Sequence, residues 1–131
     1  MTYLAVALGG ALGAALRWWL GDTVPDGAGF PWSTFAINVS GSLALACLPL
    51  SAAVRHHQRL AAGLGPGLLG GYTTMSSFSE QTRALLADGQ TATALFYLFG
   101  TLAACVVAVE VATRLYPPAL GDEFAAEGGD E

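Results

Sequence analysis

Four long apolar segments dominate this sequence and most constrain what the chain can fold into. They cover about residues 3–20, 32–53, 60–86 and 91–116. Roughly 20 helical residues, rising about 1.5 Å each, cross a hydrocarbon core of about 30 Å. Because each segment reaches or approaches that length, we predict an all-α membrane protein with four transmembrane helices.

The charged residues support lipid as the solvent for most of the chain. Only 11% of residues are charged, whereas soluble domains carry about 25%. Pro117-Pro118 should end the last helix. We therefore predict a transmembrane domain over residues 1–118 and an acidic, disordered tail over 119–131 that holds half of all the acids: Asp122, Glu123, Glu127, Asp130 and Glu131.

Because each span crosses the membrane once, four spans would place both termini on the same side of the membrane as residues 55–59. That side carries Arg55, Arg59 and Arg114, and the opposite side carries Arg17 and Arg83. Such a difference is a weak positive-inside signal, and insertion in both orientations stays open. We expect a multi-pass protein of the cell inner (plasma) membrane.

The third segment contains several features that weaken a helix. Gly65-Pro66-Gly67 and Gly70-Gly71 reduce helix propensity and remove a backbone donor. Broken backbone at membrane depth occurs only where it is buried in protein or lines water. We predict a broken helix whose released carbonyls form a candidate cation site, while a helix that is only kinked remains an alternative.

Polar side chains mark three of the four segments. Asn38 would lie well inside the second span, where an unpaired amide is costly. The hydroxyl, amide and thiol groups that we consider candidate anion donors share helical faces or neighbouring turns: Thr34, Asn38 and Ser42; Thr73, Thr74, Ser76, Ser77 and Ser79; and Tyr97, Thr101 and Cys105 at spacings of i, i+4 and i+8.

Small residues recur every four positions in the first and third segments. Gly9 and Gly13 form one such pair, and Gly63, Gly67 and Gly71 form a second stripe. In lipid, such stripes allow helix backbones to approach closely, so we expect close helix packing along both of them. Arg17 continues the first stripe, and it either extends to the headgroups or lines an aqueous vestibule.

Three stretches resemble the Fluc (CrcB) family of fluoride channels. They are "GGALGAALRW" (9–18), "WSTFAINVSGS" (32–42) and "GGYTTMSSFSEQ" (70–81). The corresponding family patterns are G-x3-G-A-x2-R-[YW], G-T-x3-N-x2-G-S and G-G-x-T-T-F-S-T-F-S-x-E. We expect the glycines, the hydroxyls and the acid of the third stretch all to fall in register with the family pattern.

This resemblance implies a passive, fluoride-selective channel that exports fluoride and lowers its toxicity. It implies a dual-topology, antiparallel dimer of four-helix subunits, with a central structural sodium ion bound by the backbone carbonyls of Gly70 and Thr73. It places Arg17 at the vestibule. It assigns the fluoride pathway to Thr34, Asn38, Thr74, Met75, Ser77, Phe78, Tyr97, Thr101 and Cys105.

Met75 is the main departure from the family pattern, because a phenylalanine is expected there. A thioether lacks the positive ring edge that can face an anion. Two interpretations follow: a conducting homodimer that tolerates methionine, or one non-equivalent half of an obligate heterodimer. Trp32-Ser33 is a milder departure.

Two other functional classes fit the sequence less well. A small four-helix proton-coupled exporter would need an acid near the middle of the first span, and none is present there. An intramembrane enzyme would need a serine–histidine or paired-aspartate arrangement within the spans, but both histidines, His56 and His57, lie in a connector. We therefore do not expect an enzyme.

Overall fold

The computed structural model describes residues 2–118 and 120, and these residues form helices and short connectors with no strand. The predicted tail over 119–131 lies outside the described residues, apart from Leu120. The long helices are α1 (Thr2–Thr23), α2 (Trp32–Cys47) and α7 (Thr91–Thr113). The all-helical prediction is confirmed.

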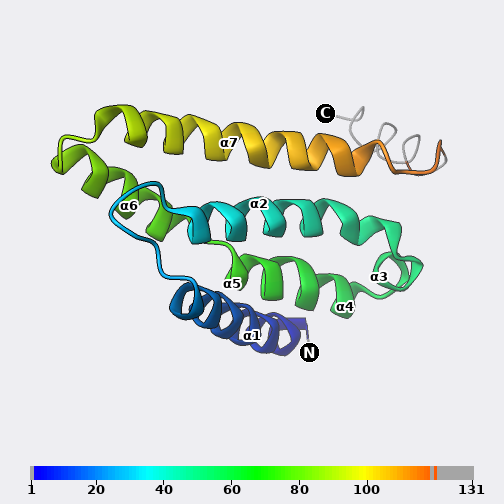
Figure 1. Ribbon diagram of the computed structural model, residues 1–131. Helices are drawn as coiled ribbons and strands as arrows, with labels where there is room; N and C mark the ends of the chain where they lie inside the picture. The colour runs from blue at the N-terminus through cyan, green and yellow to red at the C-terminus, as the bar shows by residue number, and fades with distance from the viewer. Residues whose placement is uncertain (1, 119, 121–131) are drawn as a thin grey trace, which may run out of the picture.

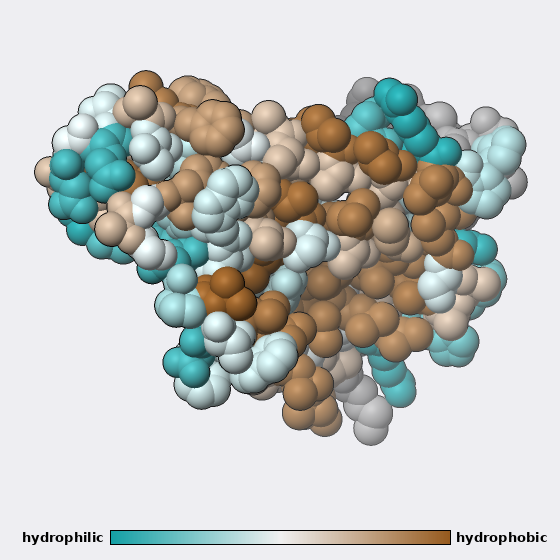
Figure 2. All heavy atoms as spheres, in the orientation of Figure 1, coloured by the Kyte–Doolittle hydropathy of each residue, from teal (hydrophilic) through white to brown (hydrophobic). Residues whose placement is uncertain are grey.

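Three stretches of the described chain are long and apolar enough to cross a membrane: Thr2–Thr23, Trp32–Leu50 and Thr91–Thr113. Figure 2 shows hydrophobic side chains over the middle of the molecule and hydrophilic ones gathered towards its two ends. The chain is therefore a multi-pass membrane protein. The predicted third span does not meet the same criterion, because it consists of shorter helical pieces: α4 (Gln58–Ala62), the π-helix η2 (Gly63–Leu69), α5 (Gly70–Tyr72) and α6 (Met75–Ala87).

The second segment also ends earlier than its apolar composition suggested. After α2 the chain forms a 3-10 turn, η1 (Leu48–Leu50), and then the short helix α3 (Ala52–His56). Pro49 lies at the start of this turn. Because proline has no N–H group and its ring clashes with the preceding turn, an α-helix cannot continue regularly through it.

The third segment is interrupted at Thr73 and Thr74 rather than at its proline. Thr73 has ψ 159° and Thr74 has φ −146° and ψ 116°, so both residues are extended between α5 and α6. Around Pro66 the chain instead widens into the π-helix η2. This wider turn accommodates the proline ring and the missing donor while helical winding continues to Tyr72.

The interruption allows the third segment to change its packing partner. Before it, η2 and α5 lie against α1; after it, α6 lies against α7, which also packs along α2 (Figure 1). Phe78 on α6 and Tyr97 on α7 belong to the buried cluster that joins these two helices.

The predicted close helix packing at the glycine stripes is confirmed, and the structure shows that the stripes of α1 and the third segment meet each other. A Cβ atom added at Gly9 would overlap the carbonyl oxygen of Gly63, and one at Gly13 would overlap that of Leu68. From the other side, a Cβ atom at Gly71 would overlap the carbonyl oxygen of Gly10. A side chain at any of these positions would separate the two backbones.

Candidate ion pathway at the interrupted helix

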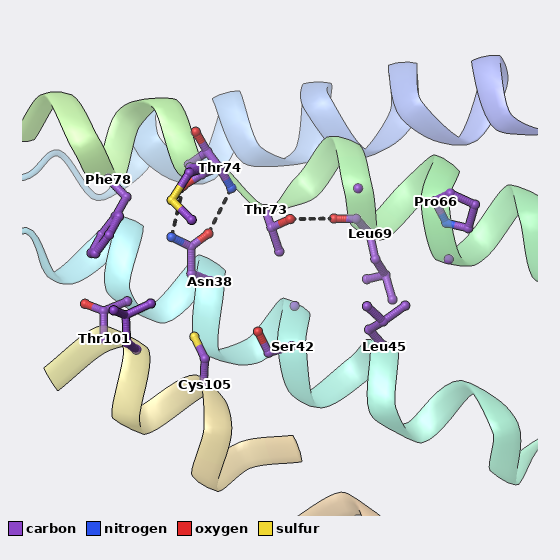
Figure 3. Close-up of a pocket in the computed structure, with 15 residues that line it drawn as sticks. Asn38, Ser42, Leu45, Pro66, Leu69, Thr73, Thr74, Phe78, Thr101 and Cys105 are labelled. Atoms are coloured by element: carbon purple, nitrogen blue, oxygen red, sulfur yellow. Dashed lines mark hydrogen bonds between the residues drawn. The ribbon is translucent and has the colours of Figure 1, made fainter. Parts of the chain in front are cut away.

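Asn38 on α2 holds the interrupted backbone through both ends of its amide. The Thr74 N–H donates to Asn38 Oδ1 at 2.8 Å, and Asn38 Nδ2 donates to the Thr74 carbonyl at 3.1 Å (Figure 3). The side chain thus pairs with Thr74 as a peptide group pairs across a sheet. This pairing satisfies both backbone groups where the helix cannot.

The same geometry removes the helical donors of the carbonyl groups next to the interruption, among them those of Gly70 and Thr73. In an α-helix the carbonyl of residue i accepts from the N–H of residue i+4. The donor for Gly70 would be Thr74 N–H, which binds Asn38, and the donor for Thr73 would be Ser77 N–H, which binds Thr74 Oγ1 at 3.1 Å. Both carbonyls are therefore available as oxygen ligands.

Arg17 binds the third segment and is half-buried. Its Nε donates to the carbonyl oxygen of Gly71 at 3.1 Å. In a continuous helix that carbonyl would accept from Met75 N–H, so Arg17 replaces a donor that the interruption removes. This contact anchors the side chain beside the protein backbone, and Arg17 also lines an open pocket.

Most of the predicted ion-pathway residues line one groove of about 560 Å³ on the surface of the chain. Figure 3 shows its labelled side chains converging from α2, the third segment and α7. The side chain of Met75 is 68% exposed, whereas Phe78 beside it is buried. The predicted site residues in this groove are Asn38, Gly70, Thr73, Thr74, Met75, Phe78, Thr101 and Cys105.

A second, more polar pocket of about 440 Å³ lies beside the groove. It contains the predicted residues Arg17, Thr34 and Ser77, and it shares Thr74 with the groove. Thr74 therefore separates two open spaces that contain different parts of the predicted set. Tyr97 lines neither space, because it is completely buried against Phe78, with ring centroids 5.0 Å apart.

Several neutral donor groups in these two spaces keep a hydrogen that no described residue accepts, and three of them belong to the predicted fluoride pathway. The hydroxyl of Thr101 is buried and makes no hydrogen bond. The Ser77 hydroxyl accepts from Thr74 Oγ1 at 3.0 Å but does not donate, and Asn38 Nδ2 uses only one of its two hydrogens. A buried polar group without a partner is rare, so the Thr101 hydroxyl in particular indicates a ligand or water.

Other predicted hydroxyls are already engaged. Thr73 Oγ1 donates to the Leu69 carbonyl at 3.0 Å, and Thr34 Oγ1 donates to Asp26 Oδ2 at 3.3 Å. Each threonine has a single hydroxyl hydrogen. The side-chain hydrogen of Thr34 is therefore directed to an acid and away from any incoming anion.

Asp26 and Gln81 belong to the polar pocket, and sequence reasoning did not single them out. Asp26 Oδ1 accepts from the N–H of Ser33 at 2.7 Å, and Oδ2 accepts from Gln81 Nε2 at 3.0 Å. The carboxylate thereby satisfies a free donor in the first turn of α2. The one available signal was a short acidic side chain shortly before a helix.

The register of the third motif requires a correction. Its pattern ends on an acid at the twelfth position, and Gln81 occupies that position here. Glu80 lies one residue earlier, on the exposed face of α6, where it forms an ion pair with Arg83. A helix turns about 100° per residue, so the acid has moved off the face that borders the pocket.

Comparison with known proteins agrees with the motifs. The family model for CrcB-like protein, Camphor Resistance (CrcB), matches residues 4–113. A Thermus thermophilus protein named fluoride-specific ion channel FluC is 50% identical over 105 residues, covering 76% of this chain and 82% of the relative. Proteins of the same name from Paracoccus denitrificans and Anaeromyxobacter are each 43% identical, covering 82% and 86% of this chain and 88% and 92% of the relatives.

These matches extend over α1, α2, the interrupted third segment and α7. The relatives are named as channels, which confirms the expectation that the chain is not an enzyme. The chain belongs to the CrcB-like family, as the three motifs indicated.

Proposed function

We propose that this protein is a subunit of a fluoride channel that lets fluoride leave the cell passively and so lowers its toxicity. The observation that supports this function most directly is the set of free neutral donors on Asn38, Ser77 and Thr101. They lie in two adjoining spaces next to the interrupted helix. The names of the relatives support fluoride as the ion.

Neutral donors suit a small and strongly hydrated anion. Conduction requires that an ion enter a site favourably and also leave it. Hydroxyl and amide hydrogens can replace part of a hydration shell without binding the ion as tightly as a buried lysine would. The positive edge of the Phe78 ring, which lines the same groove, can provide a further weak contact.

Arg17 is suited to attract anions to the polar pocket. Its Nε is held by the Gly71 carbonyl, and its charge remains at the border of the pocket. A fixed positive charge at a pore entrance raises the local concentration of anions. The charge stays outside the groove. Inside the groove, a positive charge would hold fluoride too strongly.

In this proposal the third segment crosses the membrane as a fourth, broken span. The interruption would be tolerated at membrane depth because Asn38 and Arg17 satisfy its backbone and because it borders water-accessible space. Two such subunits would associate in antiparallel fashion in the plasma membrane, each covering the open groove of the other. Fluoride would then move between the subunits.

Sodium fits the proposed role of a structural ion at the centre of this dimer. Hard cations prefer oxygen ligands, and the carbonyls of Gly70 and Thr73 lack their helical donors. Within the described residues no group of three or more acidic, histidine or cysteine side chains could bind a metal instead. A bound cation would supply a fixed positive charge that holds the two interruptions together.

Reconstitution into liposomes tests the function. The purified protein alone should release fluoride at least about 100-fold faster than empty vesicles and should not release chloride at a comparable rate, because chloride is the larger ion and a narrow pathway excludes it. An ion-selective electrode measures both ions. Fluoride efflux no faster than from empty vesicles would contradict the homodimeric channel.

Met75 favours a second candidate, in which the chain is one half of a heterodimeric channel. Its side chain is 68% exposed at the groove, where the family pattern has a phenylalanine. In that case the protein alone would be inactive, and fluoride efflux would appear only when a similar subunit with phenylalanine at this position is added.

Replacing Met75 with phenylalanine should raise fluoride efflux by about three- to tenfold, since a ring edge contributes about 0.5–1.5 kcal/mol in favourable contacts. The open surroundings of Met75 accept the ring without overlap. Met75→Leu is the matched control, because it changes the side chain without adding a ring and should leave efflux unchanged. Equal rates for both variants would show that the aromatic edge is not needed.

A further inference from the structure

Asp26 lies at one end of a continuous chain of contacts that leads to Phe78. Its Oδ2 accepts from Gln81 Nε2 at 3.0 Å, and Gln81 Oε1 accepts from the hydroxyl of Tyr97 at 2.8 Å. The Tyr97 ring then packs on the Phe78 ring at 5.0 Å between centroids. The chain thus connects the α1–α2 connector, α6 and α7.

The carboxylate of Asp26 determines how the Gln81 amide is oriented. A carboxylate only accepts hydrogen bonds, so it must face the NH₂ group of Gln81. The amide oxygen is thereby directed to Tyr97, whose hydroxyl donates to it. Tyr97 is completely buried and Phe78 is 5% exposed, so the ring that packs on Tyr97 has little freedom to turn.

We propose that Asp26 is a positioning residue for ion passage: it supplies, from the α1–α2 connector, the carboxylate that the third motif lacks at Gln81, and through Gln81 and Tyr97 it fixes the ring of Phe78. This inference rests on the proposed fluoride channel. The connector runs beside α6 (Figure 1), and the carboxylate borders the polar pocket that also contains Arg17.

An exchange of the two side chains tests the pairing. Gln81→Glu places two carboxylates where a 3.0 Å hydrogen bond stood, so fluoride efflux should fall by about 30-fold or more because like charges at that distance repel. Asp26→Asn removes one acceptor oxygen and should lower efflux by about tenfold.

The double variant, Asp26→Asn with Gln81→Glu, should recover efflux to within about threefold of the unmodified protein, since the interaction of contacting residues is not additive. Asparagine can donate to the new carboxylate and still accept from Ser33 N–H, and the carboxylate can still accept from Tyr97. If the double variant releases fluoride no faster than Gln81→Glu alone, the proposal is overturned.

Asp22→Asn is the control for charge alone. Asp22 lines the same polar pocket, is exposed, and makes no hydrogen bond to the described residues. Its replacement removes the same negative charge but breaks no hydrogen bond, so it should not lower efflux and should raise it slightly, because less negative charge beside Arg17 favours anion entry. An equal loss for Asp22→Asn and Asp26→Asn would assign the effect to pocket charge and overturn positioning.

A readout at Phe78 separates this inference from the proposed function. The ring resonances of Phe78, labelled with carbon-13 and assigned by their loss in Phe78→Leu, should shift in Asp26→Asn and return in the double variant. A protein that does not conduct fluoride but shows these shifts of the Phe78 resonances would contradict the channel and keep the positioning role. Unshifted resonances in Asp26→Asn would overturn the positioning role whatever the efflux.

Discussion

Gly13→Ala should prevent α1 from docking on the third segment and leave little folded protein. The added methyl group would overlap the Leu68 carbonyl oxygen and lie 2.8 Å from the backbone nitrogen of Tyr72. Both neighbours are backbone atoms and cannot rotate away. Overpacking a well-packed core costs about 1–3 kcal/mol even where side chains can adjust, so we expect a larger loss here.

Gly10→Ala is the matched control in the same helix. A Cβ atom there would meet only the Gly67 carbonyl oxygen, at 3.9 Å, which is an ordinary contact. Thermal melting and size-exclusion chromatography in detergent should therefore show an almost unchanged protein for Gly10→Ala and a strongly destabilised one for Gly13→Ala. Similar melting temperatures for the two variants would mean that α1 does not contact the third segment so closely.

Asn38→Asp should reduce fluoride efflux by about 100-fold or more and also destabilise the protein. The new carboxylate still accepts from Thr74 N–H, but it replaces the Nδ2 donor with an oxygen that faces the Thr74 carbonyl across 3.1 Å. An unsatisfied buried group costs about 1–3 kcal/mol, and an uncompensated buried charge adds to that cost. Because Asn38 also carries a free N–H, the substitution should both destabilise the interrupted backbone and remove a donor from the fluoride pathway.

Ser42→Ala provides the comparison for Asn38→Asp. Ser42 lies one turn further along α2 and lines the same groove, but its hydroxyl makes no hydrogen bond among the described residues. We expect its efflux to fall by only about threefold and its stability to stay unchanged, because one free donor is lost from the groove but no partner loses its bond. If Asn38→Asp conducts as well as Ser42→Ala, the amide is not part of the pathway.

Much of the fold and the family could be predicted from the sequence. The four long apolar segments predicted four spanning helices, and three of these segments contain a helix long and apolar enough to cross a membrane. The four-residue spacing of Gly9 and Gly13, and of Gly67 and Gly71, predicted close helix packing at these positions. These features depend on composition and on local periodicity, which a single sequence displays directly. The three motifs likewise indicated the family that the comparison then gave.

Where the third segment is interrupted, and which residues hold it there, depends on tertiary packing. Gly65-Pro66-Gly67 and Gly70-Gly71 predicted a break without fixing its position, and the chain absorbs the proline in a wider turn and opens at Thr73 and Thr74. That outcome depends on Asn38, which lies 36 residues away and replaces the lost helical bonds.

The same reason explains why Asp26 and the contact of Arg17 with Gly71 were not foreseen. Their partners lie 55 and 54 residues away in the sequence. Such bonds form only after α1, α2 and α6 have packed, because packing brings the donors and acceptors within reach. Local propensity therefore specifies the helices, while the pairing of buried polar groups across them selects the position of the break.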